Sequence, residues 1–374
     1  MNESIVQRLR HGVVEPLKGR FVGRDEVADL IALAALAGEH LFLYGPPGTA
    51  KSALIRQFAQ AVRGRCFEYM LTRFSEPNEI FGPIDIARLR EGTVVTVTTG
   101  MLPEAEFVFL DELFNANSAI LNNLLTVLNE RVYRRGAETH RLPLLSLFSA
   151  SNHLPEDEAL RALFDRFLFR CHVENLRREA MPRLLAAGWA LERGTAAEST
   201  VSATALAALA NRVHDVDLAG VLEPYMELVF KVRDLGVAFS DRRAVKVLKL
   251  LAASALLCGR GAARPSDLWV LRYVWDREEQ IAPLVALVGG LLESAPAEQA
   301  HPLAARPERA DGEALAKQLE DVEAALGGGT LSLVELARLR EQVAGVSDRA
   351  AWVADAAGRE QLLARAGELL ERIG

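Results

Sequence analysis

A lysine–serine pair and an aspartate–glutamate pair are the residues of this chain whose types and spacing could carry chemistry. Residues 45–52 read GPPGTAKS, and a later apolar stretch, FVFLDE, ends in Asp111 and Glu112. A lysine at the end of such a loop offers a point charge to phosphate oxygens, and the hydroxyl that follows, here Ser52, can ligate Mg²⁺. The aspartate can hold the Mg²⁺ shell, and the glutamate can polarise an attacking water. The spacing therefore predicts a site that binds a nucleotide with Mg²⁺ and activates water for attack on a phosphate.

The loop departs from the usual phosphate-binding pattern at Ala50, where a second glycine is expected. Alanine keeps its backbone N–H, so the loop loses no donor, but a positive φ at this residue would cost about 1–2 kcal/mol. We therefore expect a negative φ at Ala50. The alternative is an ordinary Gly-Pro turn before a helix, which the terminal Lys-Ser pair argues against. The residues predicted to bind the nucleotide in this loop are Gly45, Pro46, Pro47, Gly48, Thr49, Ala50, Lys51 and Ser52.

Short apolar runs alternate with helical patterns in the first half of the chain, and this alternation predicts a parallel, doubly wound α/β sheet. The runs that read as strands cover 41–44, 66–71, 107–112, 142–152 and 167–175. Helices are expected over 3–18, ending near Pro16, and over 21–39, 52–64 and 117–131. Ligands bind at the carboxyl edge of such sheets. The loop after the first strand and the acids that end the third should therefore meet at one edge.

Two further polar residues are candidates for the same reaction. Asn152 ends the fourth run and could orient the attacking water or touch the γ-phosphate, and an Asx-turn into the next loop is the alternative. Arg166 precedes the fifth run, on a flank from which it could not easily reach the phosphates of its own chain. It could reach those of a neighbouring copy, as an arginine finger in trans. The alternative for Arg166 is a surface ion pair with Asp165.

The second half of the chain is rich in alanine and leucine and reads as helical. The predicted organisation is a nucleotide-binding α/β domain over 1–178, a helical lid over 179–293, a linker over 294–311 and a C-terminal helical domain over 312–374. Within the last domain, helices are expected over 313–326, 331–346 and 349–372, with GGGT at 327–330 as a break. The leucine spacing of these helices favours a packed bundle over a free coiled coil.

The charge, the cysteines and the apolar runs of the chain disfavour several classes of protein. The formal net charge is −7 and the isoelectric point about 5.7, which disfavours general coating of nucleic acid. Three scattered cysteines, Cys66, Cys171 and Cys258, give no disulfide framework or zinc spacing and suit a reducing cytoplasm. The first residues show no signal peptide, and the longest apolar run, 281–292, is too short to span a bilayer. We expect a cytoplasmic protein without membrane insertion.

The order GPPGTAKS, FVFLDE, SASN and FDRF resembles that of the AAA+ ATPases, and the resemblance covers roughly residues 18–290. The alanine before Lys51 and the stretch EIFGPIDIARLREGTVVTVTTGMLPEAE (79–106) look like the MoxR branch and its helix-2 insert. LTRFSEPNEIFGP, DELFNANSAILNNLLTVLNER and AFSDRRAVKVLKLL look most like the RavA subgroup. The resemblance implies an AAA+ P-loop NTPase core, followed by an all-helical lid and a C-terminal helical region. It also implies that the bound nucleotide is ATP or ADP with Mg²⁺, and that the reaction is hydrolysis of ATP.

The same resemblance implies roles for residues of the first domain. Val22 and Gly23 would lie against the adenine, Asn152 matches sensor 1, and Arg166 matches the arginine finger. The family is known for ring hexamers, and a finger in trans requires some such assembly. It is also known for working beside von Willebrand A-type metal-binding proteins, often as a chaperone or remodeller. We therefore expect a homo-oligomer, a von Willebrand A-domain partner and a protein client.

In the lid, Arg242 of the sequence SDRR matches sensor 2 and would sense the γ-phosphate within its own subunit. Arg243 stands next to it, so a shift of one residue stays open, and both arginines also fit a helix start capped by Ser240. Two departures from the family pattern matter. The sequence DELFN gives no polar role to Phe114, and only GGGT stands where RavA-type chains can carry an extra β domain.

Two segments are candidates for gripping what the ATPase acts on. RVYRRGAETHRLP (131–143) has four arginines with Tyr133 and His140, and it reads as a hairpin that grips a polypeptide, binds nucleic-acid phosphates or is merely solvated. The insert around 82–101 has a GTVVTVTTG core that could form a β-hairpin. No cluster of stacking aromatics accompanies the arginines, so protein remodelling is favoured over a nucleic-acid translocase. A third reading, a nucleotide-gated scaffold with slow turnover, is disfavoured by Glu112.

Overall fold

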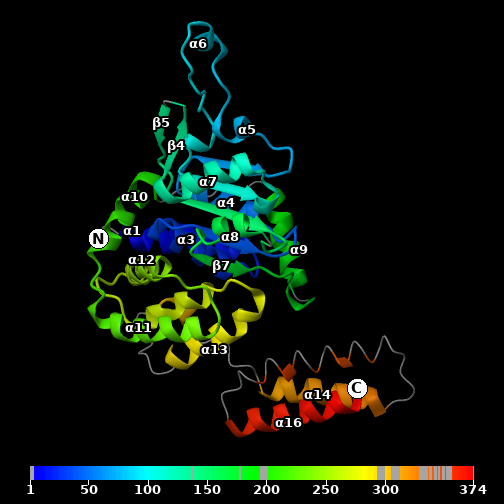
Figure 1. The fold of residues 1–374 in the computed structure, drawn as a ribbon. Coiled ribbons are helices and arrows are strands. Elements are labelled where there is room, and N and C mark those ends of the chain that lie inside the picture. Colours follow the sequence, from blue (N-terminus) through cyan, green and yellow to red (C-terminus); the bar gives the residue numbers. More distant parts are fainter. Residues whose placement is uncertain are drawn as a thin grey trace. The chain divides into compact units, whose positions relative to one another are not determined.

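A computed structural model describes residues 4–136, 138–155, 157–176, 178–193, 201–292, 300–304, 312–327 and 356–373, with scattered residues between 336 and 350. The chain divides into two compact units, Met1–Ala304 and Ala305–Gly374. The first contains a sheet with helices around it, and the second is helical (Figure 1). No helix of the described ranges is both long and apolar enough to cross a membrane.

The first unit is built on a five-stranded parallel sheet with the order β2-β3-β6-β1-β7. Its strands are β1 (Leu41–Tyr44), β2 (Cys66–Met70), β3 (Phe107–Asp111), β6 (Ser146–Ser151) and β7 (Phe169–His172). Each predicted strand is present, so the doubly wound sheet is confirmed. The central strands are almost wholly buried because helices cover both faces of the sheet.

Helices on the two faces bring the loops after the strands to one edge. α4 (Lys51–Ala61) leads from β1 to β2, whereas α7 (Ser118–Glu130) and α8 (Glu158–Phe164) lead across the sheet in the opposite direction. Right-handed crossovers therefore put α4 and its neighbour α3 (Asp25–Ala37) on one face, and α7 with α8 on the other. The carboxyl ends of β1, β3 and β6 open at the same edge, as predicted.

The N-terminal segment is nearly continuous helix, and its predicted end near Pro16 is wrong. α1 (Ile5–Leu9) passes through a π-helical turn (Arg10–Val14) into α2 (Glu15–Arg20). Pro16 stands in the first turn of α2. The π-helical turn shifts the hydrogen-bond pattern just before the proline, so its missing N–H does not end the helix.

A helical layer packs beside the sheet. It contains α9 (Met181–Glu192), α10 (Ala203–Asn211), α11 (Ala219–Asp234), α12 (Asp241–Leu257), the 3₁₀ helix η6 (Pro265–Tyr273) and α13 (Ile281–Leu292). The carboxylate of Glu39, just before β1, pairs with Lys246 at 2.8 Å and Lys249 at 3.0 Å on α12. Burial alone would raise the pKa of Glu39, but the two ammonium groups outweigh it and hold the pKa below its ordinary value. These ion pairs fix the start of α12 at the amino edge of the sheet.

Two excursions project from the sheet domain (Figure 1). They contain β4 (Val132–Arg135), β5 (Glu138–Arg141), α5 (Pro77–Phe81) and α6 (Ile86–Arg90). The hairpin predicted around 131–143 is present as the antiparallel pair β4–β5. The β-hairpin expected in the insert is wrong, because Asp85 caps α6 with its side chain and turns one arm helical. A single isolated bridge, between Ile84 and Thr96, joins the two arms.

The described part of the second unit consists mainly of two helices, α14 (Gly312–Gly327) and α16 (Ala356–Ile373). They share a hydrophobic core of their own, and Arg365 on α16 pairs with Glu323 on α14 at 2.6 Å. A packed bundle is confirmed for these residues. Gly327, the first residue of the predicted GGGT break, still belongs to α14, whereas 328–330 lie outside the described residues. Only scattered residues of the predicted helix at 331–346 are described, and most of the predicted linker at 294–311 is not.

Candidate active site

Residues 45–52 form a tight loop between β1 and α4 at the carboxyl edge of the sheet. A side chain at Gly45 would meet the carbonyl oxygen of Val173 at 2.0 Å, so this approach requires glycine. Gly48 has a φ of +78°, which glycine adopts without strain. α4 starts at Lys51, so the N–H groups of its first turn and its positive dipole end face the loop. The strand–loop–helix arrangement that binds phosphates is present.

The negative φ predicted for Ala50 is wrong. Ala50 is the N-cap of α4 and lies in the left-handed region, with φ 64° and ψ 21°. Its carbonyl accepts the N–H of Leu54 at 3.0 Å, so the chain must complete its turn into the helix at this one residue. Alanine therefore holds a conformation that suits glycine, at a cost of about 1–2 kcal/mol.

Replacing Ala50 by glycine should raise the free energy of unfolding by about 0.5–1 kcal/mol, because the strain removed exceeds the added freedom of the unfolded chain. Urea unfolding at equilibrium measures the change. The matched control is Ala53→Gly inside α4, which should lose about 1 kcal/mol. An equal loss at both positions would contradict the left-handed conformation of Ala50.

Lys51 folds its ammonium group over the loop that precedes it. The Nζ donates to the carbonyl oxygens of Gly45 at 2.9 Å and Pro46 at 2.8 Å. Burial lowers the pKa of Lys51, and the nearby charges of Asp111 and Glu112 act in the opposite direction. The structure thus brings Lys51 together with both predicted acids.

Asp111 and Glu112 stand where β3 ends. The Oδ1 of Asp111 accepts the N–H of Glu112 at 3.0 Å. Glu112 has left-handed backbone angles, φ 53° and ψ 46°. Such a conformation costs of order 1–3 kcal/mol in a non-glycine residue, and it concentrates at functional sites. The strain at Glu112 is a functional signal that the amino-acid pattern did not contain.

Asn152 directly follows β6 and lies beside the start of the phosphate loop. The sheet register pairs Ser151 with Tyr44, and the N–H of Gly45 donates to the Ser151 carbonyl at 3.1 Å. The amide oxygen of Asn152 accepts a hydrogen bond from Nδ1 of His153 at 2.9 Å. This contact uses the amide oxygen and leaves the NH₂ of Asn152 as the donor group of the side chain.

Val22, Gly23 and Arg24 border the phosphate loop before α3. The Nε of Arg24 donates to the carbonyl of Thr49 at 3.0 Å, and its Nη2 donates to the carbonyl of Glu174 at 2.8 Å. The guanidinium therefore ties the segment expected to face the adenine to the phosphate loop. Sequence reasoning missed Arg24 because its partners are backbone carbonyls, which no residue pattern indicates.

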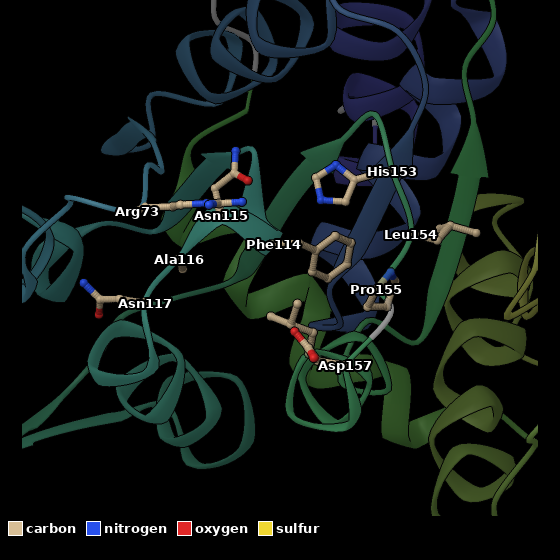
Figure 2. Close-up of a pocket in the computed structure, with 10 residues that line it drawn as sticks. Arg73, Phe114, Asn115, Ala116, Asn117, His153, Leu154, Pro155 and Asp157 are labelled. Atoms are coloured by element: carbon tan, nitrogen blue, oxygen red, sulfur yellow. The ribbon is translucent and has the colours of Figure 1, made fainter.

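A pocket of about 450 Å³, lined by both polar and apolar residues, opens beside the ends of β3 and β6 (Figure 2). Its lining residues are Arg73, Phe114, Asn115, Ala116, Asn117, His153, Leu154, Pro155, Asp157 and Leu160. Phe114 supplies an apolar wall, with its ring centroid 5.8 Å from that of His153 and 5.3 Å from that of Phe42. The lining begins just after Glu112 and Asn152 in the sequence, so the pocket borders the ends of the two strands that carry these residues.

Arg166 lies between α8 and β7, at the amino end of β7 and away from the phosphate loop of its own chain. Its Nη1 pairs with Oδ2 of Asp165 at 3.1 Å, and 23% of its side chain is exposed. The ion pair considered as an alternative role is therefore present.

The structure does not bring Arg242 to the phosphate loop of its own chain. Its Nη2 donates to Oδ1 of Asn129, at the C-terminal end of α7. That end lies at the amino edge of the sheet, since Arg131 donates to the carbonyl of Gly38, before β1. The 13 residues of α7 separate the two edges by about 20 Å. Sensing of the γ-phosphate in cis by Arg242 does not fit this arrangement, in which Glu39 anchors α12 at the far edge.

Arg243, the alternative one residue along, is buried and structural. Its Nη1 pairs with Asp276 at 2.8 Å, and its Nη2 donates to the carbonyl of Val274 at 2.6 Å. The hydroxyl of Ser240 accepts the N–H of Arg243 at 3.3 Å, so the capped helix start is present. Arg242 is exposed and is the better placed of the two for contact with a ligand or another chain.

The site fits a magnesium ion that is carried by a nucleotide. Ser52 lies in the first turn of α4 and Asp111 ends β3, which offers one hydroxyl and one carboxylate. In the described part of the chain, no group of three or more His, Cys, Asp or Glu side chains could hold a metal by itself. Proteins commonly bind Mg²⁺ through one or two side chains together with phosphate oxygens and waters.

Two family models match this chain. Residues 7–211 match the MoxR domain in the MoxR-vWA-beta-propeller ternary systems. Residues 222–288 match the AAA lid domain. Together the two matches span the phosphate loop, the paired acids and the helical layer that contains α12.

Several known proteins are similar to the chain. The uncharacterized proteins MJ0079 and MJ0812 of Methanocaldococcus jannaschii are each 38% identical to it, over 71% of this chain and 70% of theirs. Chaperone MoxR1 of Mycobacterium tuberculosis is 29% identical, over 45% of each chain. The crystal structure of a candidate ATPase from Cytophaga hutchinsonii has a TM-score of 0.62 at 19% identity, covering 78% of this chain and 95% of that one. This structural likeness supports the AAA+ fold.

Proposed function

The chain belongs to the MoxR family of AAA+ ATPases, and on that premise we propose that it is a Mg·ATP-hydrolysing subunit of a ring. The observation that carries the proposal is the placement of Asp111, Glu112 and Asn152 around the phosphate loop at one edge of the sheet. Lys51 and the amides of α4 would hold the phosphates. Ser52 and Asp111 would hold Mg²⁺, which neutralises charge on the β- and γ-phosphate oxygens.

Glu112 is the proposed general base. Its carboxylate would polarise the attacking water, and the amide of Asn152 would orient that water or donate to the γ-phosphate. Val22 and Gly23 would contact the adenine, held against the loop by Arg24. Each of these roles requires the residue to lie near the carboxyl edge of the sheet, where ligands bind in this class of fold.

Completion of the site requires a neighbouring copy. Arg166 and Arg242 both lie away from their own phosphate loop, and Asp165, which pairs with Arg166 at 3.1 Å, also faces Arg243 of α12 at 3.9 Å. Arg166, which is half-buried, and Arg242, which is exposed, therefore lie on the same flank of the subunit. A contact between that flank and the phosphate loop of the next copy is head-to-tail, and such contacts form a ring when the rotation between copies closes. We propose a homo-oligomer, a hexamer by family resemblance, with Arg166 as the finger in trans and Arg242 on the same face.

The matched family description points to the partner class. A MoxR domain of MoxR-vWA-beta-propeller systems is expected to act beside a von Willebrand A-domain protein, and we propose such a partner and a chaperone-like action on a protein client. The finer RavA-like placement is part of the proposal and rests on the resemblance of LTRFSEPNEIFGP, DELFNANSAILNNLLTVLNER and AFSDRRAVKVLKLL. The cytoplasmic location and the domain boundaries 1–178, 179–293, 294–311 and 312–374 belong to the same proposal.

The hairpin β4–β5 lends little support to the alternative, a nucleic-acid translocase. Arg134 and Arg135 of the hairpin, and Arg131 just before it, each donate to a group of their own chain. They are thereby less available for a phosphate backbone, and the chain is acidic overall.

Steady-state hydrolysis of ATP tests the proposed function. Turnover should require Mg²⁺, should be lost in Glu112→Gln, and should not respond to single- or double-stranded DNA at low salt. Activation by DNA that fades as salt rises would favour the translocase instead. Tight ATP binding without turnover in the assembled native protein would favour the nucleotide-gated scaffold.

A further inference from the structure

A buried network of arginines and an aspartate joins the lid to β7. Arg170 on β7 and Arg243 on α12 both donate to Oδ1 of Asp276, at 2.5 Å and 2.8 Å. Their side chains are only 1% and 2% exposed. Burial, reinforced by the charge of Arg243, lowers the pKa of Arg170 to about 9. Two guanidinium groups so close together depend on Asp276 between them for compensation of their charge.

Asp165 extends this network to Arg166. Its Oδ2 pairs with Nη1 of Arg166 at 3.1 Å, and its Oδ1 faces Nε of Arg243 at 3.9 Å. The Nε of Arg166 is buried and has no hydrogen-bond partner in the part of the chain that the structure describes. Arg170 donates to the carbonyl of Phe164 at 3.0 Å and thereby holds the end of α8. Asp165 is thus the contact that orients the Arg166 guanidinium.

The other end of the network touches the strand that carries the phosphate loop. Trp275, next to Asp276, packs edge-on against Tyr44, with ring centroids 6.2 Å apart. Tyr44 is the last residue of β1, and its hydroxyl donates to Oε2 of Glu278 at 3.3 Å. A displacement of the loop at Gly45 would therefore move Tyr44 against Trp275 and shift the segment that carries Asp276.

From these contacts we propose that Asp165, Arg243 and Asp276 are positioning residues for Arg166, and that they couple the nucleotide state of one subunit to the arginine it presents to the next. This proposal rests on the trans role of Arg166 proposed above. The phosphate loop of a subunit sets, through Tyr44 and the network, the orientation of its own Arg166. Turnover around the ring is then cooperative rather than independent at each site.

Mixed assemblies separate positioning from a merely structural role. One subunit carries Glu112→Gln and contributes only its Arg166, while the other carries Arg166→Ala and contributes only its catalytic site. Adding Asp165→Asn to the Glu112→Gln subunit should lower kcat about 10- to 100-fold and leave the KM for ATP unchanged. Adding Asp165→Asn to the Arg166→Ala subunit should leave kcat unchanged. Equal losses in both arrangements, or no loss in either, would overturn the proposal.

Glu68→Gln is the matched control, because Glu68 pairs with Arg56 at 2.8 Å and its side chain is 34% exposed, like that of Asp165. It should change kcat in neither arrangement. If Asp165→Asn subunits do not assemble, Arg243→Lys replaces them, since lysine keeps the charge but loses the forked contact, and the same asymmetry is expected. No turnover in the mixture without Asp165→Asn would overturn the trans role of Arg166 itself, and this proposal with it.

The coupling has its own readout in homogeneous rings. Asp165→Asn should lower the Hill coefficient for ATP toward one, because the link between the phosphate loop and Arg166 is broken. Glu68→Gln should leave the coefficient at its native value. A native coefficient of one, or a coefficient unchanged by Asp165→Asn, would overturn the coupling.

Discussion

Lys51→Ala should abolish measurable ATP hydrolysis. The ammonium group is the cation that the structure places against the loop carbonyls and beside both acids, so its loss removes charge stabilisation where negative charge develops. Removal of one such preorganised group costs about 10²- to 10³-fold in kcat. A coupled assay measures the turnover, and titration calorimetry should show weaker binding of ATP in the same variant.

The control for Lys51→Ala is Lys231→Ala, which removes an exposed lysine of α11. Turnover and ATP affinity should both stay at the native level in this control. Native affinity for ATP in Lys51→Ala would contradict the phosphate loop, whatever happened to turnover.

Arg166→Ala should lower turnover about 10³-fold or more, the range seen when an arginine finger is removed. ATP affinity of the isolated subunit should not change, because Arg166 lies at the amino end of β7 rather than at the phosphate loop of its own chain. Steady-state kinetics and calorimetry on the same preparation measure the two quantities. Arg212→Ala, at an exposed arginine that follows α10, is the control and should alter neither.

A different pattern in Arg166→Ala would carry a clear meaning. A large loss of ATP affinity in a subunit kept monomeric would place Arg166 in its own site. Native turnover would show that Arg166 has no part in catalysis and only forms its ion pair with Asp165.

Local patterns predicted the sheet and the strand–loop–helix arrangement around residues 45–52 correctly because short-range physics determines both. Four apolar residues before Gly45 can only be a buried strand in this context, and Lys-Ser after the loop starts a helix. The meeting of Asp111 with Lys51 followed from the rule that parallel strands open at one edge. Alternation of strands and helices was enough to apply that rule.

Features that depend on long-range packing could not be predicted in this way. The location of Arg242 depends on where α12 packs. Glu39 pairs with Lys246 and Lys249 of this helix, which are about 200 residues away in the sequence, and these pairs hold the helix in place. The left-handed angles of Ala50 and Glu112 result from loop geometry that tolerates strain, and propensity predicts against them. Arg24 escaped notice because it acts on backbone carbonyls.

Turnover of an equimolar mixture of Glu112→Gln and Arg166→Ala subunits tests the shared active site most directly. Each variant should be inactive alone. In mixed rings about a quarter of the native turnover should return, because half of the sites keep Glu112 and half of those meet a neighbour that keeps Arg166. Mixing is verified beforehand by native mass spectrometry of differently tagged subunits. A mixture that forms mixed rings and stays inactive would contradict the trans site, and with it the proposed function of the assembly.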